Sequence, residues 1–181
     1  MLCGNNLLSI FMQNIIIIGT LHAGLTPNED LEKIFSEYKP TQILVEINQK
    51  DISGGDVKHY PPEMVFAYGW AAGNNVKING FDSKINIFKK GITENDNSDL
   101  IEKQKKLIKN YSWKDFNKSG IEKLLDIDDI TDSVKEKRRE REMLKNINEL
   151  IDDEGIVLII TGCGHLDFLE RNIKNAIFPF R

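Results

Sequence analysis

The sequence predicts an α/β fold: a central, mainly parallel sheet flanked by helices, with a helical insert between the third and fourth main strands. Two apolar runs, 15–18 and 157–160, are rich in β-branched residues and show no polar alternation, which is typical of strands buried on both faces. Each run leads into a Gly-x-x-His motif, the first ending at His22 and the second at His165. Between them, strand and helix patterns alternate, as in βαβ units.

The composition favours one globular domain covering 1–181. The chain has 181 residues, 40% of them apolar and 29% charged, and a net charge of −4, which argues against broad nucleic-acid binding. Its two cysteines make no disulfide framework. The apolar stretch 7–12 has no basic residue before it, unlike a secretory signal. We interpret it as a short leader before a possible start at Met12, and expect a cytoplasmic protein without a transmembrane segment.

The first helix and second strand follow directly after His22. Thr26 is expected to cap the helix, with Pro27 at its first position and Glu29 completing a capping box. Pro40 ends this element. Residues 41–47 form the predicted second strand, which carries Glu46 near its carboxyl end.

A second helix is expected to open at the His-Tyr-Pro-Pro segment 59–62 and to end at Gly73. Its predicted buried side consists of Met64, Val65, Tyr68, Ala71 and Ala72. The third strand is predicted at 76–81, and Asp82 follows at its end.

The stretch 91–131 interrupts this alternation and is rich in Lys, Asn and Asp. Its short apolar patches indicate two or three short helices inserted into the α/β frame. Lysines near Tyr111 and Trp113 form a possible nucleic-acid surface, but the acidic residues among them favour a solvated helix face. A lid over the strand ends is a further possibility.

A long helix is predicted from Ser133, with Glu136 completing a capping box, to about residue 152. Helical spacing places Arg139 one turn before Met143 on its inward side. Charged residues, Glu140 among them, are expected on the opposite faces. The fourth strand and a final helix over 166–176 complete the chain.

Four polar side chains therefore stand at or near strand ends: His22, Glu46, Asp82 and His165. The carboxyl edge of an open parallel sheet is where ligands bind. Each residue alone also has a structural explanation, such as a hydrogen-bonded core histidine or a turn-closing aspartate. Together, imidazole and carboxylate groups suit a divalent ion such as Zn, Mn or Co, with open positions for an activated water.

Two more residues carry different chemistry. Cys163 lies between the glycines of the second motif. We interpret it as a small side chain packed under the turn; the alternative is a thiolate nucleophile. His59 precedes two prolines and is expected at the surface.

Five short motifs in order resemble the TraB/TIKI group, related to ChaN-like and erythromycin-esterase-like proteins. They are Ile-Gly-Thr-Leu-His at 18–22, Lys-Pro at 39–40 with Leu-Val-Glu-Ile at 44–47, Gly-Phe-Asp at 80–82, Arg-Glu-x-x-Met at 139–143, and Gly-x-Gly-His at 162–165. The resemblance covers roughly 14–82 and 135–176. In the family, Asp or Asn typically follows the Arg, whereas Glu140 follows here.

The resemblance implies an α/β fold that holds a divalent metal through His22, His165 and a carboxylate, Glu46. It also implies catalytic roles for Glu46, Arg139 and Asp82. The resulting hypothesis is a metal-dependent hydrolase of a peptide, ester or related acyl bond, in which a carboxylate acts as general base and Arg139 steadies the oxyanion. Two rival hypotheses are a non-catalytic regulatory or ligand-binding module of the same fold and a thiol hydrolase that uses Cys163.

Overall fold

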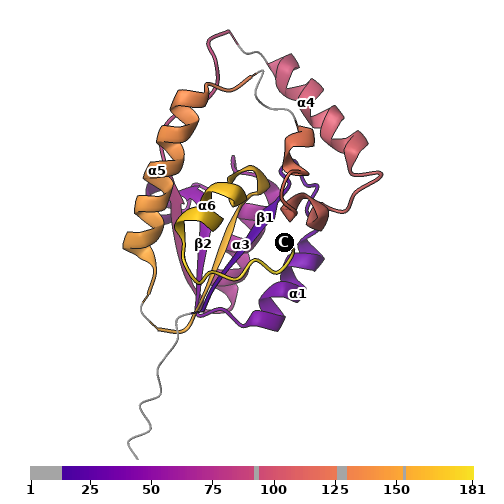
Figure 1. Cartoon of the computed structure of the whole chain (residues 1–181). Helices are drawn as coiled ribbons and strands as arrows, with labels where there is room; N and C mark the ends of the chain where they lie inside the picture. The colour runs from indigo at the N-terminus through magenta and orange to yellow at the C-terminus, as the bar shows by residue number, and fades with distance from the viewer. Residues whose placement is uncertain (1–13, 92–93, 126–129, 153) are drawn as a thin grey trace, which may run out of the picture.

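The computed structural model contains one parallel four-stranded sheet (Figure 1) and describes residues 14–91, 94–125, 130–152 and 154–181. The leader segment 7–12 and the possible start at Met12 lie outside these ranges. The strands lie in the order β1 (Asn14–Thr20), β4 (Ile156–Gly162), β2 (Gln42–Asn48) and β3 (Lys77–Asp82). All three pairings are parallel, which confirms the α/β prediction.

The strand register brings the predicted motifs to one edge. Ile18 of β1 and Val45 of β2 both pair with Ile160 of β4. The residues that follow, in β1, β4 and β2 alike, therefore lie at the same level beyond this row. Two strands whose sequences lie far apart, β1 and β4, are direct neighbours in the sheet.

Helices cover both faces of the sheet. On one side α1 (Asn28–Tyr38) packs on α3 (Pro62–Gly73), which contacts β2 and β3. On the other, α5 (Ser133–Leu150) contacts β3 and α6 (Leu166–Asn172), and α6 contacts β1 (Figure 1). The isoleucines of β1 and Ile159 and Ile160 of β4 are buried between these layers, as expected for apolar strands of a two-sided parallel sheet.

The described part of the insert, 94–125 with its flanks, contains one α-helix and two short 3₁₀ helices: α4 (Glu94–Leu107), η1 (Trp113–Asn117) and η2 (Glu122–Leu125). Its η1 segment is fixed to the sheet, because Asn117 accepts a hydrogen bond from Gly19 N at 2.7 Å and donates one to Gly19 O at 2.9 Å. Before and after the insert, Phe88 and Thr131 form an antiparallel bridge. The insert thus leaves the frame after β3 and rejoins it just before α5.

Both predicted capping boxes were wrong. The Thr26 hydroxyl accepts a hydrogen bond from Leu21 N and donates one to Leu21 O, so it closes the loop that carries His22, and Pro27 precedes α1 without a side-chain cap. At α5, Asp132 is the cap, because its carboxylate accepts from the backbone N–H groups of residues 134 and 135.

Further predicted boundaries also differ. The final helix ends at Asn172 rather than residue 176, because the chain then pairs with β1 through Ile177. A short helix, α2 (Gln49–Gly54), follows β2 and was not predicted. In α3, Ala72 is exposed, and the buried face contains Glu63 and Ala67 instead. No described helix has a stretch long and apolar enough to cross a lipid bilayer.

Candidate active site at the sheet edge

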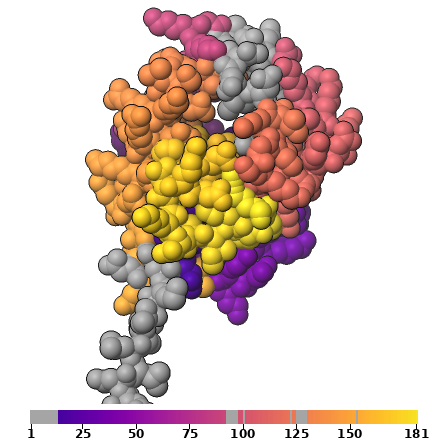
Figure 2. Space-filling model, in the orientation of Figure 1, coloured from indigo at the N-terminus to yellow at the C-terminus, as the bar shows by residue number. Residues whose placement is uncertain are grey.

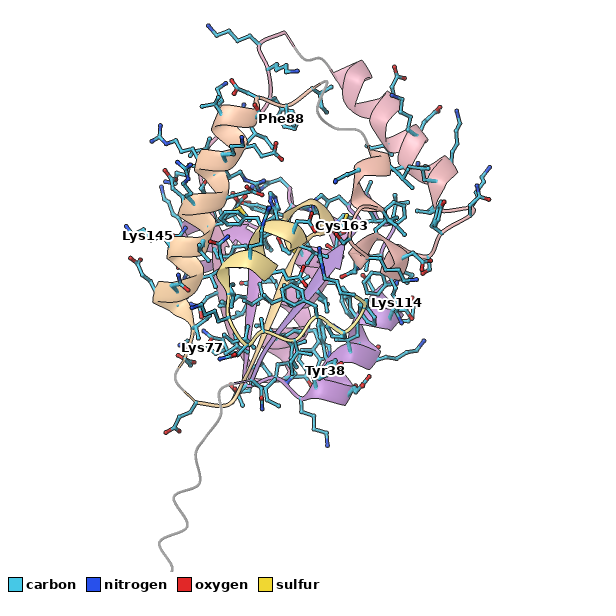
Figure 3. All side chains as sticks on the ribbon, viewed as in Figure 1. Tyr38, Lys77, Phe88, Lys114, Lys145 and Cys163 are labelled. Atoms are coloured by element: carbon cyan, nitrogen blue, oxygen red, sulfur yellow. The ribbon has the colours of Figure 1, made fainter. Side chains whose placement is uncertain are left out.

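The predicted residues His22, Glu46, Asp82, Arg139 and His165 all line one cavity of about 460 Å³. It lies beyond the carboxyl ends of the strands, beneath the insert. Figure 2 shows a hollow between α5, the C-terminal residues and the insert. In Figure 3, Cys163 marks the end of β4 below this hollow. The structure therefore gathers all five predicted side chains from four strand ends and α5.

Arg139 lies at the centre of the cluster. Its Nε donates to Asp82 Oδ1 at 2.8 Å and its Nη2 donates to Glu46 Oε1 at 2.6 Å. Burial opposes the charge of Arg139, but the two carboxylates outweigh this and raise its pKa further above its ordinary value. Arg139 thus carries a fixed positive charge, in a position that helical spacing from Met143 predicts.

Glu46 is buried and has both carboxylate oxygens bonded. Oε1 accepts from Arg139, while Oε2 accepts from Thr161 Oγ1 at 2.7 Å and Gly162 N at 2.6 Å. Burial favours the neutral acid, but the positive charges of His165 and Arg139 prevail and hold the pKa of Glu46 well below its ordinary value. A carboxylate so stabilised is a poor proton acceptor.

Asp82 differs from Glu46 although both contact Arg139. Its Oδ1 accepts from Arg139 Nε and from Ser83 N at 2.7 Å. Burial has the largest effect on Asp82, and together with the charge of Glu46 it outweighs the bonds from Arg139, so the pKa of Asp82 is raised. Arg139 therefore connects one firmly ionised carboxylate to one that accepts a proton more readily.

His165 is buried between two carboxylates. Its Nδ1 lies 3.3 Å from Glu140 Oε1, and its Nε2 lies 3.5 Å from Glu46 Oε1. Burial lowers the pKa of His165, but the charge of Glu46 and the bond to Glu140 overcome this and raise it to about 9. Arg139 Nη1 lies 3.2 Å from Nε2, a hydrogen bond only when Nε2 has no proton. Because the carboxylates favour the protonated ring, we interpret the contact as two cations that share Glu46.

Glu140 was expected on a solvated face of α5, which is wrong, because its side chain is 15% exposed and contacts His165. Its place next to Arg139 in the sequence was the available signal. A helix turns about 100° per residue, so neighbouring residues can reach two sides of one site.

His22 pairs with a residue that the sequence did not single out. Its Nδ1 lies 2.6 Å from Oε1 of Glu63, whose side chain is completely buried. Glu63 Oε2 has no hydrogen-bond partner among the described residues. Burial lowers the pKa of His22, but the bond to Glu63 and the charge of Glu46 outweigh it, so the pKa is raised. Glu63 shares a helix face with Ala67 and Ala71, both buried, and this spacing was the signal for it.

The second nitrogen of His22 faces Gly162. A Cβ at position 162 would lie 3.0 Å from His22 Nε2 and 3.5 Å from Glu46 Oε2. The absence of a side chain at Gly162 thus lets His22 and Glu46 approach the backbone closely. The His22 side chain is 44% exposed, so its ring remains accessible from the cavity while Glu63 fixes its orientation.

The residues expected to hold a divalent metal were His22, His165 and Glu46. Imidazole nitrogens oriented by carboxylates are typical of metal ligands. Here, however, both Glu46 oxygens are bonded within the protein, and Arg139 lies against the third expected ligand, His165. Across residues 14–91, 94–125, 130–152 and 154–181, no group of three or more His, Cys, Asp or Glu side chains is arranged to hold a metal ion. In this arrangement Arg139 provides the cation, and the residues do not fit a metal without its displacement.

The two remaining candidates, Cys163 and His59, differ in their surroundings. Cys163 is buried at the start of η3 (Cys163–His165) and lines the cavity. His59 is exposed and lies beside Tyr60 with ring centroids 4.5 Å apart, as expected for a surface residue.

Comparison with known proteins adds no family assignment: no family model, curated protein or solved structure matches the chain. The resemblance to the TraB/TIKI group therefore rests on the five motifs and stays a prediction.

Proposed function

We propose that the protein hydrolyses a peptide, ester or related acyl bond in this cavity, with His22 as the general base. The observation that carries the proposal is the pair formed by His22 and buried Glu63, beside the cationic pair Arg139 and His165. A histidine held by a carboxylate through Nδ1 presents Nε2 to a water molecule. The raised pKa of His22 makes its ring a stronger proton acceptor, as a general base requires.

His22 alone balances the protons of the proposed reaction. His22 Nε2 takes a proton from water as the water oxygen attacks the acyl carbon. The carbonyl oxygen becomes an oxyanion, which Arg139 and His165 stabilise by their charge. The intermediate then collapses, the bond to the leaving oxygen or nitrogen breaks, and the proton on His22 passes to that leaving atom. Carboxylic acid and alcohol or amine are the products.

Glu46 and Asp82 support this site rather than act as its base. The low pKa of Glu46 and the bonding of both its oxygens favour a positioning role, in which it holds Arg139, His165 and the backbone at Gly162 together. Asp82 holds the other side of the Arg139 guanidinium. Glu63 is likewise a positioning residue, because it acts through His22.

The test compares His22→Asn with His59→Asn, a matched change at an exposed histidine. Loss of a general base lowers kcat by about 10²- to 10⁴-fold, so we expect this loss in kcat for p-nitrophenyl esters with His22→Asn and none with His59→Asn. Glu63→Gln is expected to lower kcat with a smaller change in KM, and to shift the pH dependence of kcat. Equal activity in all variants would refute the role of His22.

A second candidate, the metal-dependent hydrolase, is favoured by the carboxylate on Nδ1 of each histidine. It requires Arg139 to move away from Glu46 and His165. Metal content of the purified protein, compared with the His22→Ala and His165→Ala variants, separates the two. If the wild type binds a metal that both variants lose, and chelation abolishes activity, the metal-dependent mechanism would be supported over the one in which Arg139 provides the cation.

Ester hydrolysis also distinguishes a thiol hydrolase and a binding module from these two mechanisms. Activity that survives chelation but is lost on alkylation, and on Cys163→Ser, would indicate the thiol hydrolase. Ligand binding without turnover of any ester or peptide would indicate a regulatory or binding module.

A further inference from the structure

An apolar wall, formed by Ile85, Ile87, Phe88 and Ile130, lines part of the cavity. Ile85, Ile87 and Phe88 lie just before the insert and Ile130 lies at its end, where the chain pairs through Phe88 and Thr131. The same cavity is lined by Arg139 and the two histidines, and also by other polar residues, among them Asn86, Gln104, Thr131 and Glu136. One cavity therefore contains both the charged cluster and an apolar wall.

The four side chains of the apolar wall are not used by the core. Among the described residues, the partly buried apolar side chains packed against the core do not include them. Ile85 and Ile87 are half-buried and alternate with exposed Asn86 and Phe88. Phe88 is 41% exposed. Apolar surface left in contact with water is unfavourable, so an apolar ligand group that covers this surface would be stabilised here.

The backbone holds this wall in place. Asp132 N donates to Ile87 O at 2.8 Å, and Lys89 N donates to Ile130 O at 3.0 Å. These bonds tie the segment after β3 to the start of α5, the helix that carries Arg139. The apolar wall and the charged cluster therefore keep a fixed relation to each other.

We infer that the substrate carries an extended apolar group, such as a medium-length acyl chain, on its scissile acyl bond. This inference rests on the proposed function and adds the substrate class. The apolar group would lie against Ile85, Ile87 and Ile130, with the carbonyl at Arg139 and His165. A cavity of about 460 Å³ lies in the range that holds small molecules, roughly 300–1,000 Å³.

The first experiment measures kcat/KM for p-nitrophenyl octanoate and p-nitrophenyl acetate, which share a leaving group. We expect the wild type to prefer the octanoate ester by at least about tenfold, because burial of its additional methylenes against the apolar wall stabilises the bound ester. Ile87→Asn is expected to reduce this preference about tenfold. Val134→Asn is the control, because Val134 is 77% exposed on the first turn of α5.

The second experiment measures octanoate binding by calorimetry and needs no catalysis. We expect one octanoate per chain, bound about tenfold more weakly by Ile87→Asn and by Ile130→Asn but equally by Val134→Asn. If the two isoleucine variants bind octanoate more weakly but the wild type hydrolyses no ester, the apolar site would be supported and the hydrolase refuted. Equal kcat/KM for the acetate and octanoate esters, with equal octanoate binding in all variants, would overturn the inference without contradicting the proposed hydrolase.

Discussion

Arg139 decides the electrostatics of the site, because it is the shared partner of Glu46, Asp82 and His165. It donates through two nitrogens at once, Nε to Asp82 and Nη2 to Glu46, a geometry that the planar guanidinium provides and Lys does not. Its side chain is 13% exposed, and that of Glu46 is 5% exposed. The cluster is therefore a buried charge network in which each member depends on the others.

Arg139→Leu is expected to destabilise the fold. It removes the cation bonded to Asp82 and one of the two cations that share Glu46, and loss of one partner of a buried ion pair costs about 3–5 kcal/mol. The measurement is the free energy of unfolding by chemical denaturation. The control, Arg138→Leu, removes an exposed pair with Glu142 at 3.5 Å and should cost under about 1 kcal/mol. Equal effects of the two substitutions would contradict the central role of Arg139.

Residues that act locally could be predicted from the sequence, and those that act across the fold could not. The apolar runs predict the strands, and they therefore also predict which polar residues lie at or near the strand ends: His22, Glu46, Asp82 and His165. Glu63 reaches His22 across 41 positions of sequence. Helical spacing places Glu63 on the face of Ala67 and Ala71, but only the packing of α3 in the fold shows that His22 is its partner.

Tyr60 connects three elements beside the cavity. Its hydroxyl donates to Asp51 Oδ2 at 2.6 Å in α2 and accepts from Asn48 N at 3.2 Å at the end of β2. Residue 60 itself precedes α3, the helix that carries Glu63. The unpredicted helix α2 thus helps to position the start of α3.

The pH dependence of Tyr60 follows from this pairing. Burial and the bond to Asp51 raise its pKa to about 12. Since the folded value exceeds the unfolded value of 10, Tyr60 stabilises the fold below pH 10 and loses this contribution as the pH rises toward 12. Ultraviolet titration of the four tyrosines should contain one late component that Tyr60→Phe removes. A Tyr60→Phe variant whose titration still contains the component near pH 12 would contradict the assignment.

Asn117 joins η1 to the outer edge of β1, the strand at one end of the sheet. Its side-chain amide bonds both backbone groups of Gly19, as a neighbouring strand would, while Ile177 pairs farther back along β1. An edge strand presents backbone groups that need partners. The insert is therefore not a free lid in its η1 segment.

Asn117→Ala should lower the free energy of unfolding. It leaves Gly19 N and Gly19 O, both buried, without their partners, and each unsatisfied group costs about 1–3 kcal/mol. Hydrogen exchange at the Gly19 amide is expected to accelerate in the same variant. Asn110→Ala changes an exposed asparagine of the same insert and should alter neither quantity. Unchanged exchange at Gly19 would rule out the anchor.

At the scale of the whole molecule, the sheet order explains why distant motifs share one site. Because β4 lies between β1 and β2, its histidine is next to both His22 and Glu46. The alternation of strands and helices predicted the α/β class but not this order, which depends on where each crossover returns. The insert and its flanks then enclose the strand ends, with apolar residues on one wall of the cavity.

The most direct test of the account is the kcat of purified wild type and His22→Asn on p-nitrophenyl octanoate, both measured after removal of metal ions. The account predicts turnover by the wild type and a loss of about 10²-fold or more in the variant. Equal turnover by the two proteins, or wild-type turnover that appears only when a divalent metal is restored, would contradict it.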